Sequence, residues 1–325
     1  MIAGICLKRA CIGYRNMFID IAVNLTDDMF QGIYHDKKRH ECDLNLVLER
    51  ARDAKCDKMI VLAGSFEDAQ KCAILCDELD PKSESLFTTI GVHPTRCDSI
   101  METDQVDNVT SLFKDFIGAR PKRVAAFGEF GLDYDRLHFC SRENQLRGFE
   151  AQLKAVEHLR GDSVDLPLLL HLRNAFDDFV HLMNKYKHVW ETCGGVVHSF
   201  TGTRDEMETL TDMGLYIGLN GCSLRTEESL RDVIPFIPLD KIMYETDSPY
   251  CDVRSTHPGY QFLHPSTSFK PEKFQMGSMV KNRNEPACIQ NVAIIVARAR
   301  GVDVSSLSKA VHENTVRLFK QLVRR

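Results

Sequence analysis

Short apolar runs recur along the chain, and segments with helical spacing of apolar residues lie between them. Runs rich in β-branched residues predict buried strands, whereas apolar residues three and four positions apart predict the buried face of a helix. The eight predicted strands are Phe18–Val23, Met59–Ala63, Phe87–Val92, Val124–Phe127, Pro167–Leu170, Gly195–Val197, Leu215–Leu219 and Ile242–Tyr244. Helical stripes separate them, for example Leu44, Val47, Leu48 and Ala51, then Ala69, Cys72, Ala73 and Cys76.

This alternation of strand and helix is typical of a parallel sheet, because each helix returns the chain to the edge where the next strand begins. Eight such units close most simply into a (β/α)8 TIM barrel of the α/β class. The alternative is an open doubly wound sheet. No G-x-G-x-x-G motif follows any of the predicted strands, so the dinucleotide fingerprint that would favour this alternative is missing.

Polar residues indicate where two of the helices begin. Ser65 precedes Asp68, and Thr203 precedes Glu206, each by three positions. A hydroxyl oxygen at the start of a helix accepts a hydrogen bond from an unpaired first-turn amide, and an acidic residue there favours the positive end of the helix dipole. We therefore expect Ser65 and Thr203 to cap helices.

The alternation of predicted strands and helices ends after the eighth strand. Residues 250–286 form a long polar segment that contains four prolines, too long for a passive connection, so we expect a structured loop at an active site. Two amphipathic helices, near Cys288–Arg300 and Ser305–Leu322, then end the chain. Because nothing between the units resembles a linker, we expect one barrel domain over residues 17–325.

Composition narrows the class of protein without deciding its function. Hydrophobic residues make up 43% and charged residues 27% of the 325 positions, which is typical of a globular protein and excludes collagen and disorder. The formal net charge of −5 argues against a broad surface that coats nucleic acid, but permits a local basic patch. No apolar run is long enough to span a bilayer. The twelve cysteines form no C-x-x-C pair, so we interpret them as reduced thiols of an intracellular protein in the cytoplasm or nucleus.

The first residues carry a basic bias. Lys8, Arg9 and Arg15 occur before the first acid, as in a mitochondrial targeting segment. Met17 stands directly before the first strand, so residues 1–16 are either such a segment or a dispensable extension.

Several predicted strands end on a titratable side chain. The residues that follow the apolar runs are His93, Glu129, His171, His198 and the group Glu245, Thr246 and Asp247. A hydrogen-bonded structural role explains each of them singly. Their equivalent positions on different strands favour a shared site, because the carboxyl ends of parallel barrel strands meet on one face.

Imidazole and carboxylate groups together suit zinc, manganese or magnesium. Such an ion lowers the pKa of bound water and polarises an ester or phosphoryl oxygen, so metal-assisted hydrolysis is the natural reaction class. Anion-binding candidates follow the same strands: Arg173 comes two residues after His171, and Lys281 and Arg283 lie in the long loop. Guanidinium groups contact phosphate in pairs of hydrogen bonds, and Tyr250 is a candidate for stacking on a base.

Seven ordered segments of the chain resemble the TatD-type metal-dependent deoxyribonucleases. They are Phe18–Ile21, Gly91–Pro94, Gly128–Tyr134, Leu170–Arg173, His198–Thr203, Glu245–Tyr250 and Arg283–Pro286. The resemblance covers residue 17 to the C-terminus, and the length of the segment 251–282 is similar to that in the eukaryotic branch of the family.

This resemblance implies a metallo-dependent hydrolase barrel that cleaves DNA, commonly from a 3′ end, with Mg²⁺. It implies that Glu129, His171, His198 and Asp247 are metal ligands, that Asp247 also acts as a base, and that His93 contacts phosphate or assists the leaving oxygen. The expected substrate is single-stranded or frayed DNA, with RNA as a second substrate.

The first strand departs from the family pattern. Many relatives carry Asp-x-His-x-His there, whereas this chain has Asp20, Ala22 and Asn24. Two imidazoles are missing, and Asn24 offers only a neutral carbonyl oxygen. We therefore expect one firmly held ion, with a second that enters with substrate phosphate and uses Asp20 and Asn24.

Two other functions remain open from the sequence. The same metal chemistry would hydrolyse an ester or amide, for instance on an aminoacyl-tRNA. A barrel that lost its first-strand ligands could instead be a non-catalytic interaction module, although four candidate ligands remain.

Overall fold

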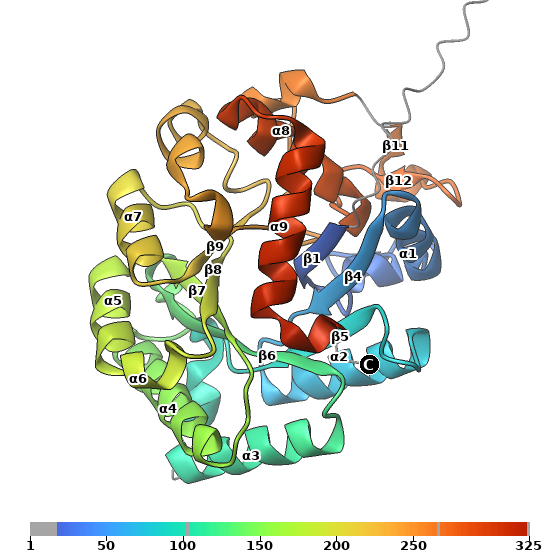
Figure 1. Cartoon of the computed structure of the whole chain (residues 1–325). Coiled ribbons are helices and arrows are strands. Elements are labelled where there is room, and N and C mark those ends of the chain that lie inside the picture. Colours follow the sequence, from blue (N-terminus) through green and yellow to red (C-terminus); the bar gives the residue numbers. More distant parts are fainter. Residues whose placement is uncertain (1–17, 102–104, 265–266, 324–325) are drawn as a thin grey trace, which may run out of the picture.

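The computed structural model describes residues 18–101, 105–264 and 267–323, so the predicted extension 1–16 lies outside the described residues. Eight strands form one sheet in which each strand pairs in parallel with the next in the chain (Figure 1). In sheet order they are β1 (Phe18–Val23), β4 (Cys56–Val61), β5 (Leu86–Ile90), β6 (Val124–Asp133), β7 (Leu168–Arg173), β8 (Gly195–His198), β9 (Tyr216–Leu219) and β10 (Ile242–Tyr244).

The last strand returns to the first. Beyond β10, the amide of Asp247 donates to the carbonyl of Ala22 at 2.8 Å, and the amide of Asn24 donates to the carbonyl of Ser248 at 2.7 Å. A parallel bridge joins Val23 to Ser248. These contacts complete the ring, so the predicted TIM barrel is confirmed and the open sheet is excluded.

Helices surround the barrel (Figure 1). They are α1 (Leu44–Asp53), α2 (Phe66–Leu79), α3 (Gln105–Ala119), α4 (Arg142–Gly161), α5 (Phe176–Lys185), α6 (Lys187–Trp190), α7 (Arg204–Asp212), α8 (Ile289–Arg300) and α9 (Val304–Leu318). Both predicted caps are present, since Ser65 accepts from the Asp68 amide and Thr203 forms a reciprocal capping box with Glu206. In the described parts of the chain no helix is both long and apolar enough to cross a membrane.

The C-terminal segment covers the end of the barrel at which the strands begin. Leu318, Phe319 and Leu322 pack with inward-facing strand residues such as Ile19 and Phe87 in one buried cluster. Asn314 on α9 donates to the carbonyl of Ile242, the first residue of β10, at 3.0 Å. The opposite end of the barrel, where the strands finish, is therefore the end available to a site.

Two elements differ from the sequence prediction. Between β9 and β10 the chain forms the short helical turns Ser229–Val233, Ile234–Phe236 and Leu239–Lys241 in place of an α-helix, because Pro235 and Pro238 lack the amide hydrogens that a helix needs. Strand β6 continues to Asp133, six residues beyond the predicted end at Phe127, after a register shift between Phe127 and Phe130. Glu129 therefore lies inside the strand.

The segment 250–286 is structured, as expected, but its position differs from the expected one. It contains the helical turn Pro258–Phe262 and a small parallel pair, β11 (Ser268–Phe269) and β12 (Met279–Val280). Residues from Asp252 to Arg283 line a separate cavity of about 650 Å³. Of the described residues in this segment, Tyr250 and Cys251 at its start line the larger cavity over the barrel.

Candidate active site

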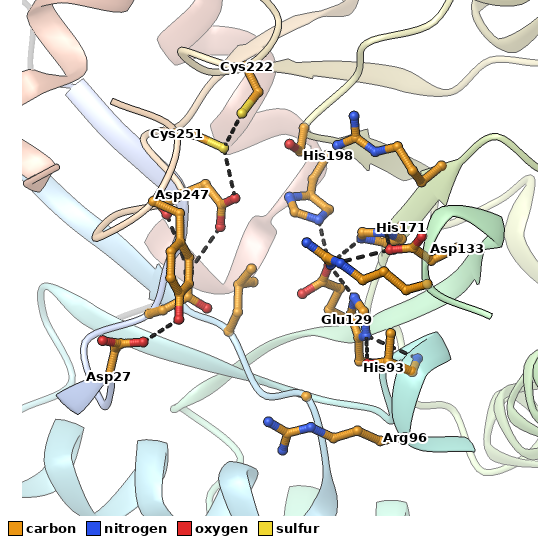
Figure 2. A pocket seen from close by; sticks show the side chains of 18 of the residues that line it. Asp27, His93, Arg96, Glu129, Asp133, His171, His198, Cys222, Asp247 and Cys251 are labelled. Carbon is orange, nitrogen blue, oxygen red and sulfur yellow. Dashed lines mark hydrogen bonds and ion pairs between the residues drawn. The ribbon is translucent and has the colours of Figure 1, made fainter. Parts of the chain in front are cut away.

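The carboxyl ends of the strands surround a cavity of about 890 Å³. Its lining includes the five candidates His93, Glu129, His171, His198 and Asp247 (Figure 2), which come from the segment after β5, from β6, β7 and β8, and from the segment after β10. The register of the strands explains part of this convergence, because His171 on β7 is paired with His198 on β8. The predicted meeting of distant residues at one face is therefore observed.

Glu129 is the centre of the cluster. Its Oε1 lies 2.6 Å from Nε2 of His198, 2.7 Å from Nδ1 of His171 and 3.7 Å from Nε2 of His93 (Figure 2). Glu129, His171 and His198 are buried. A buried carboxylate within reach of three imidazoles is a strongly polar arrangement that an apolar barrel core does not require.

The opposite charges of Glu129 and His198 stabilise each other. Burial would raise the pKa of Glu129, but His198, His93 and the hydrogen bond with His171 hold that pKa well below its usual range. Burial would lower the pKa of His198, but Glu129 and Glu245 raise it well above its usual range. Glu129 is therefore ionised at neutral pH, which is the form that binds a cation.

His93 belongs to the same group of potential ligands. One nitrogen or oxygen of His93, Glu129 and His171 lies within 4.8 Å of each of the others. Burial lowers the pKa of His93 to about 3, despite the opposing effect of Glu129, so the ring is neutral and can bind a metal. The geometry thus adds His93 to the candidate ligands, a role that the sequence analysis did not give it.

Asp247 lines the cavity apart from the Glu129 cluster (Figure 2). Its Oδ1 accepts a hydrogen bond from Nδ2 of Asn24 at 2.9 Å, and its Oδ2 accepts one from Sγ of Cys251 at 3.3 Å. Burial raises the pKa of Asp247 to about 6, although His198 opposes the shift. Two fixed donors therefore orient a carboxylate that takes up a proton more readily than an exposed one.

Asp133 is a site residue that the sequence analysis missed. It is buried and lines the cavity, and its Oδ2 lies 3.1 Å from Nε2 of His171, on the ring nitrogen opposite Glu129. A carboxylate on the far nitrogen of a ligand histidine fixes the orientation of the ring. The signal was its spacing: side chains four positions apart on a strand share a face, and Asp133 is four residues after Glu129.

The first-strand residues have other partners. Asp20 is fully buried and does not line the cavity; it accepts hydrogen bonds from the backbone amide and the hydroxyl of Thr246. This position corrects the expectation that Asp20 binds an ion. Asn24 does line the cavity, but its amide nitrogen is used on Asp247, so only its carbonyl oxygen remains for a ligand.

The predicted anion-binding residues divide into two groups. Arg173 and Tyr250 line the cavity, and Arg173 donates to the hydroxyl of Thr201 at 2.6 Å. Lys281 lines the separate cavity of the segment 250–286. Arg283 is fully buried, where it forms ion pairs with Asp43 at 2.6 Å and Glu285 at 2.9 Å, so the expectation that it contacts substrate is wrong.

Three further arginines line the cavity, namely Arg96, Arg136 and Arg225. All three are exposed. Arg96 pairs with Asp68, and Arg136 pairs with Asp133 at 3.3 Å. The sequence analysis did not single them out, although Arg96 and Arg136 each lie two residues after one of the quoted segments, Gly91–Pro94 and Gly128–Tyr134.

Comparison with known proteins places the chain in a family. The family model described as "TatD related DNase" matches residues 19–320. The chain belongs to the TatD DNase family. A deoxyribonuclease Tat-D from Schizosaccharomyces pombe is 39% identical over 94% of this chain and 96% of its own length. A bacterial relative from Citrobacter koseri, described as a 3′-5′ ssDNA/RNA exonuclease TatD, is 32% identical over 92% and 98%.

The fold agrees with this membership. The crystal structure of a TatD family hydrolase from Entamoeba histolytica superposes with a TM-score of 0.85 at 34% identity, and the match covers 94% of this chain and 98% of that one. This TatD family member is thus a hydrolase. The family resemblance seen in the sequence is confirmed over residues 19–320.

The donor set of this TatD family member fits a divalent metal. Histidine nitrogens and a carboxylate oxygen converge at Glu129, a combination that zinc and manganese accept readily and magnesium accepts with water in its shell. Nδ1 of His198 lies 3.6 Å from Oε1 of Glu245, and the other carboxylate oxygen of Glu245, Oε2, is buried with no hydrogen-bond partner among the described residues.

Proposed function

We propose that this TatD family member is a metal-dependent deoxyribonuclease that removes nucleotides from the 3′ end of single-stranded or frayed DNA, with Mg²⁺ as the ion and RNA as a second substrate. The observation that carries the proposal is the buried Glu129 carboxylate, surrounded by three histidines at the base of a cavity lined by arginines. The names of the fungal and bacterial relatives support a nuclease and, for the bacterial one, the 3′-5′ direction.

Glu129, His93, His171 and His198 bind the first ion from one side of the cavity in this proposal, and Asp247 binds it from the other side. A bound divalent ion supplies a low-pKa water and stabilises charge on the phosphoryl oxygens. Asp133 orients His171, and Asn24 orients Asp247. A second ion enters with the substrate phosphate on the Asp247 side, where one carboxylate and the Asn24 carbonyl leave the coordination incomplete.

Phosphate binding is assigned to the arginines of the cavity. The described partners of Arg173, Arg96 and Arg136 use only some of the five N–H groups of each guanidinium, so donors remain for phosphate as far as the described residues show. Guanidinium groups suit phosphodiester oxygens because they donate two parallel hydrogen bonds. These residues lie around the same opening as Glu129, which favours an anionic polymer over a neutral ester.

Tyr250 supports a single-stranded substrate. Its side chain lines the cavity and is 48% exposed, and its hydroxyl donates to Asp27. An exposed ring with a fixed hydroxyl offers a face on which an unpaired base can stack. Bases in an intact duplex are already stacked on their neighbours, so we propose that Tyr250 receives a base at a frayed or single-stranded end.

We propose that the enzyme works in the cytoplasm or nucleus. The cysteines that the structure describes are free thiols, which is the usual state in a reducing compartment. Imaging of the tagged full-length chain in its own cell tests this, and accumulation in mitochondria would contradict it.

The direct test is cleavage of single-stranded DNA labelled at the 5′ or the 3′ end, with Mg²⁺, Mn²⁺ or a chelator. We expect metal-dependent release of nucleotides from the 3′ end. Glu129→Gln should lower the rate by more than about 100-fold, the upper limit for residues that only support a ligand. Glu208→Gln, on an exposed position of α7, is the matched control and should cleave at the wild-type rate.

The same preparation separates the alternative functions. Rapid hydrolysis of an aminoacyl-tRNA with intact DNA would make the protein an esterase. Equal DNA cleavage by the wild type and Glu129→Gln would show that a contaminant cleaves the DNA. Intact substrates under every metal condition would favour the non-catalytic barrel.

A further inference from the structure

Two cysteines face each other in the wall of the active-site cavity. Cys222 follows β9 and Cys251 follows β10, and both are half-buried and line the cavity. Their Sγ atoms lie 2.6 Å apart (Figure 2). The pair is thus close enough to react and open to small molecules that enter the cavity.

The backbone holds the two cysteines together. A Cβ atom on Gly221 would lie 2.0 Å from the carbonyl oxygen of Cys251, so only glycine permits the two segments to pack this closely. The amide of Cys222 donates to Oδ1 of Asn220 at 2.8 Å, and Asn220 itself donates to Glu245 at 2.8 Å. The contact between the sulfurs is therefore a consequence of main-chain packing and buried hydrogen bonds.

The pair is connected to Asp247, one of the proposed ligands. Sγ of Cys251 lies 3.3 Å from Oδ2 of Asp247 and 2.6 Å from Sγ of Cys222, so its single S–H hydrogen is shared between these two acceptors, while Asn24 donates to Oδ1 of Asp247. On the other side, Nη2 of Arg225 lies 3.3 Å from Sγ of Cys222. A change at the sulfurs therefore alters one of the two described side-chain contacts that orient Asp247.

Cys222 has the surroundings of a reactive thiol. Its hydrogen bond with Cys251 and the charge of Arg225 lower the pKa of Cys222 to about 7, in spite of its burial. By contrast, burial raises the pKa of the thiols of Cys72, Cys76 and Cys97. Because the thiolate is the form that reacts with oxidants, the nearby guanidinium favours oxidation at Cys222 over these buried cysteines.

We propose that Cys222 and Cys251 are a redox modification site, at which hydrogen peroxide forms a reversible disulfide that lowers DNA cleavage. The Cys222 thiolate attacks one peroxide oxygen and breaks the O–O bond; the sulfur becomes a sulfenic acid, and the released hydroxide takes a proton to form water. Cys251 then attacks this sulfur, the S–O bond breaks, and a second water leaves. Two thiols are oxidised by two electrons in all, and one peroxide is reduced to two waters.

The disulfide removes the hydrogen bond from Cys251 to Asp247. Asp247 then keeps only Asn24 as a side-chain donor of those described, so the orientation of its carboxylate is no longer fixed from both sides. Loss of a group that orients a ligand lowers metal affinity by about 10- to 100-fold. A dithiol reverses the change by thiol-disulfide exchange. The effect on cleavage rests on the proposed nuclease function, whereas formation of the disulfide does not.

The test combines peptide mapping, Mn²⁺ affinity by calorimetry and cleavage of single-stranded DNA, each on the full-length protein before and after hydrogen peroxide and again after dithiothreitol. We expect a linked peptide pair that contains Cys222 and Cys251, Mn²⁺ affinity and cleavage both lowered by about 10-fold or more, and recovery with dithiothreitol. Cys222→Ser should resist the loss. Cys42→Ser, at an exposed cysteine outside the cavity, should lose activity as the wild type does.

Three results overturn the proposal: no linked peptide, a linked peptide with unchanged Mn²⁺ affinity, or equal peroxide sensitivity in Cys222→Ser. If the untreated protein cleaves no DNA, the proposed function fails by itself, and peptide mapping with Mn²⁺ affinity still decides the redox site.

Discussion

At the scale of single residues, the site depends on Glu129 and on the groups that orient its neighbours. The sequence predicted that the proposed ligands Glu129, His171 and His198 lie at one site, because each directly follows or lies within an apolar run whose end has a known direction in a barrel. It did not predict partners defined only in three dimensions. Arg283 was expected at the substrate because it lies in the long loop after the last strand and guanidinium groups bind phosphate, yet its loop folds back and buries it against Asp43 and Glu285.

Asp133 provides a test of orientation without loss of a proposed ligand. Asp133→Asn keeps the size of the side chain but removes the charge that faces Nε2 of His171. We expect Mn²⁺ affinity to fall by about 10- to 100-fold, measured by calorimetry, with an unchanged unfolding transition in the absence of metal ions. Equal affinity in the variant and the wild type would show that Glu129 alone orients His171.

Substitution of Arg283 should lower the free energy of unfolding and leave DNA binding unchanged. Arg283→Met leaves two buried carboxylates with Arg50 as their one remaining cation among the described residues, and breaking a buried ion pair by removing one partner costs about 3–5 kcal/mol in free energy of unfolding. Urea unfolding measures this. Lys71→Met, at an exposed pair with Glu67, is the control and should show a much smaller change. A stable Arg283→Met protein with weakened DNA binding would restore the original expectation for Arg283.

At the scale of elements, strand β6 shows most clearly what the sequence could and could not predict. Its apolar start at Val124–Phe127 is evident from the pattern. Its continuation to Asp133 is not, because Gly128 and Gly131 lower strand propensity. Both glycines have positive φ, and a Cβ on Gly131 would lie 2.0 Å from the carbonyl oxygen of His171. The close approach of β6 to β7 that joins Asp133 to His171 therefore needs glycine at this position.

Gly131→Ala should disturb this approach. The strained backbone conformation costs about 1–3 kcal/mol for a residue with a side chain, and contact with the His171 carbonyl must also move β7. We expect a lower urea midpoint together with weaker Mn²⁺ binding. Gly118→Ala, where a Cβ would have no neighbour within 4 Å, is the matched control. Wild-type metal affinity in Gly131→Ala would show that the strands adjust without moving the ligands.

At the scale of the whole molecule, one end of the barrel is filled and the other is open. Leu318, Phe319 and Leu322 cover the starts of the strands. The histidine and carboxylate side chains of the cavity lie at the ends of the strands. The fold of eight strand-helix units was predictable because the spacing of apolar residues identifies each strand and helix locally, and the number of these units then indicates a barrel. The Cys222–Cys251 contact was not predictable, because the two cysteines are 29 positions apart in the sequence and no motif links them. They meet because β10 pairs with β9 in the sheet.

A metal held at the strand ends should stabilise the whole barrel, because it binds the folded state. At about 100 times the dissociation constant the gain is about 2.7 kcal/mol, which should raise the thermal midpoint by several degrees. Scanning calorimetry of the wild type with Mn²⁺ and with a chelator measures the shift. Glu129→Gln should show almost none, and an equal shift in this variant would mean that Mn²⁺ binds elsewhere.

The most direct measurement is anomalous X-ray scattering from crystals soaked in Mn²⁺. The account predicts a manganese peak at the mouth of the barrel, within bonding distance of the Glu129 carboxylate and of nitrogen atoms of His93, His171 or His198. A peak bonded only to residues outside this cluster, or no peak in the cavity of an enzyme that cleaves DNA under the same conditions, would contradict it.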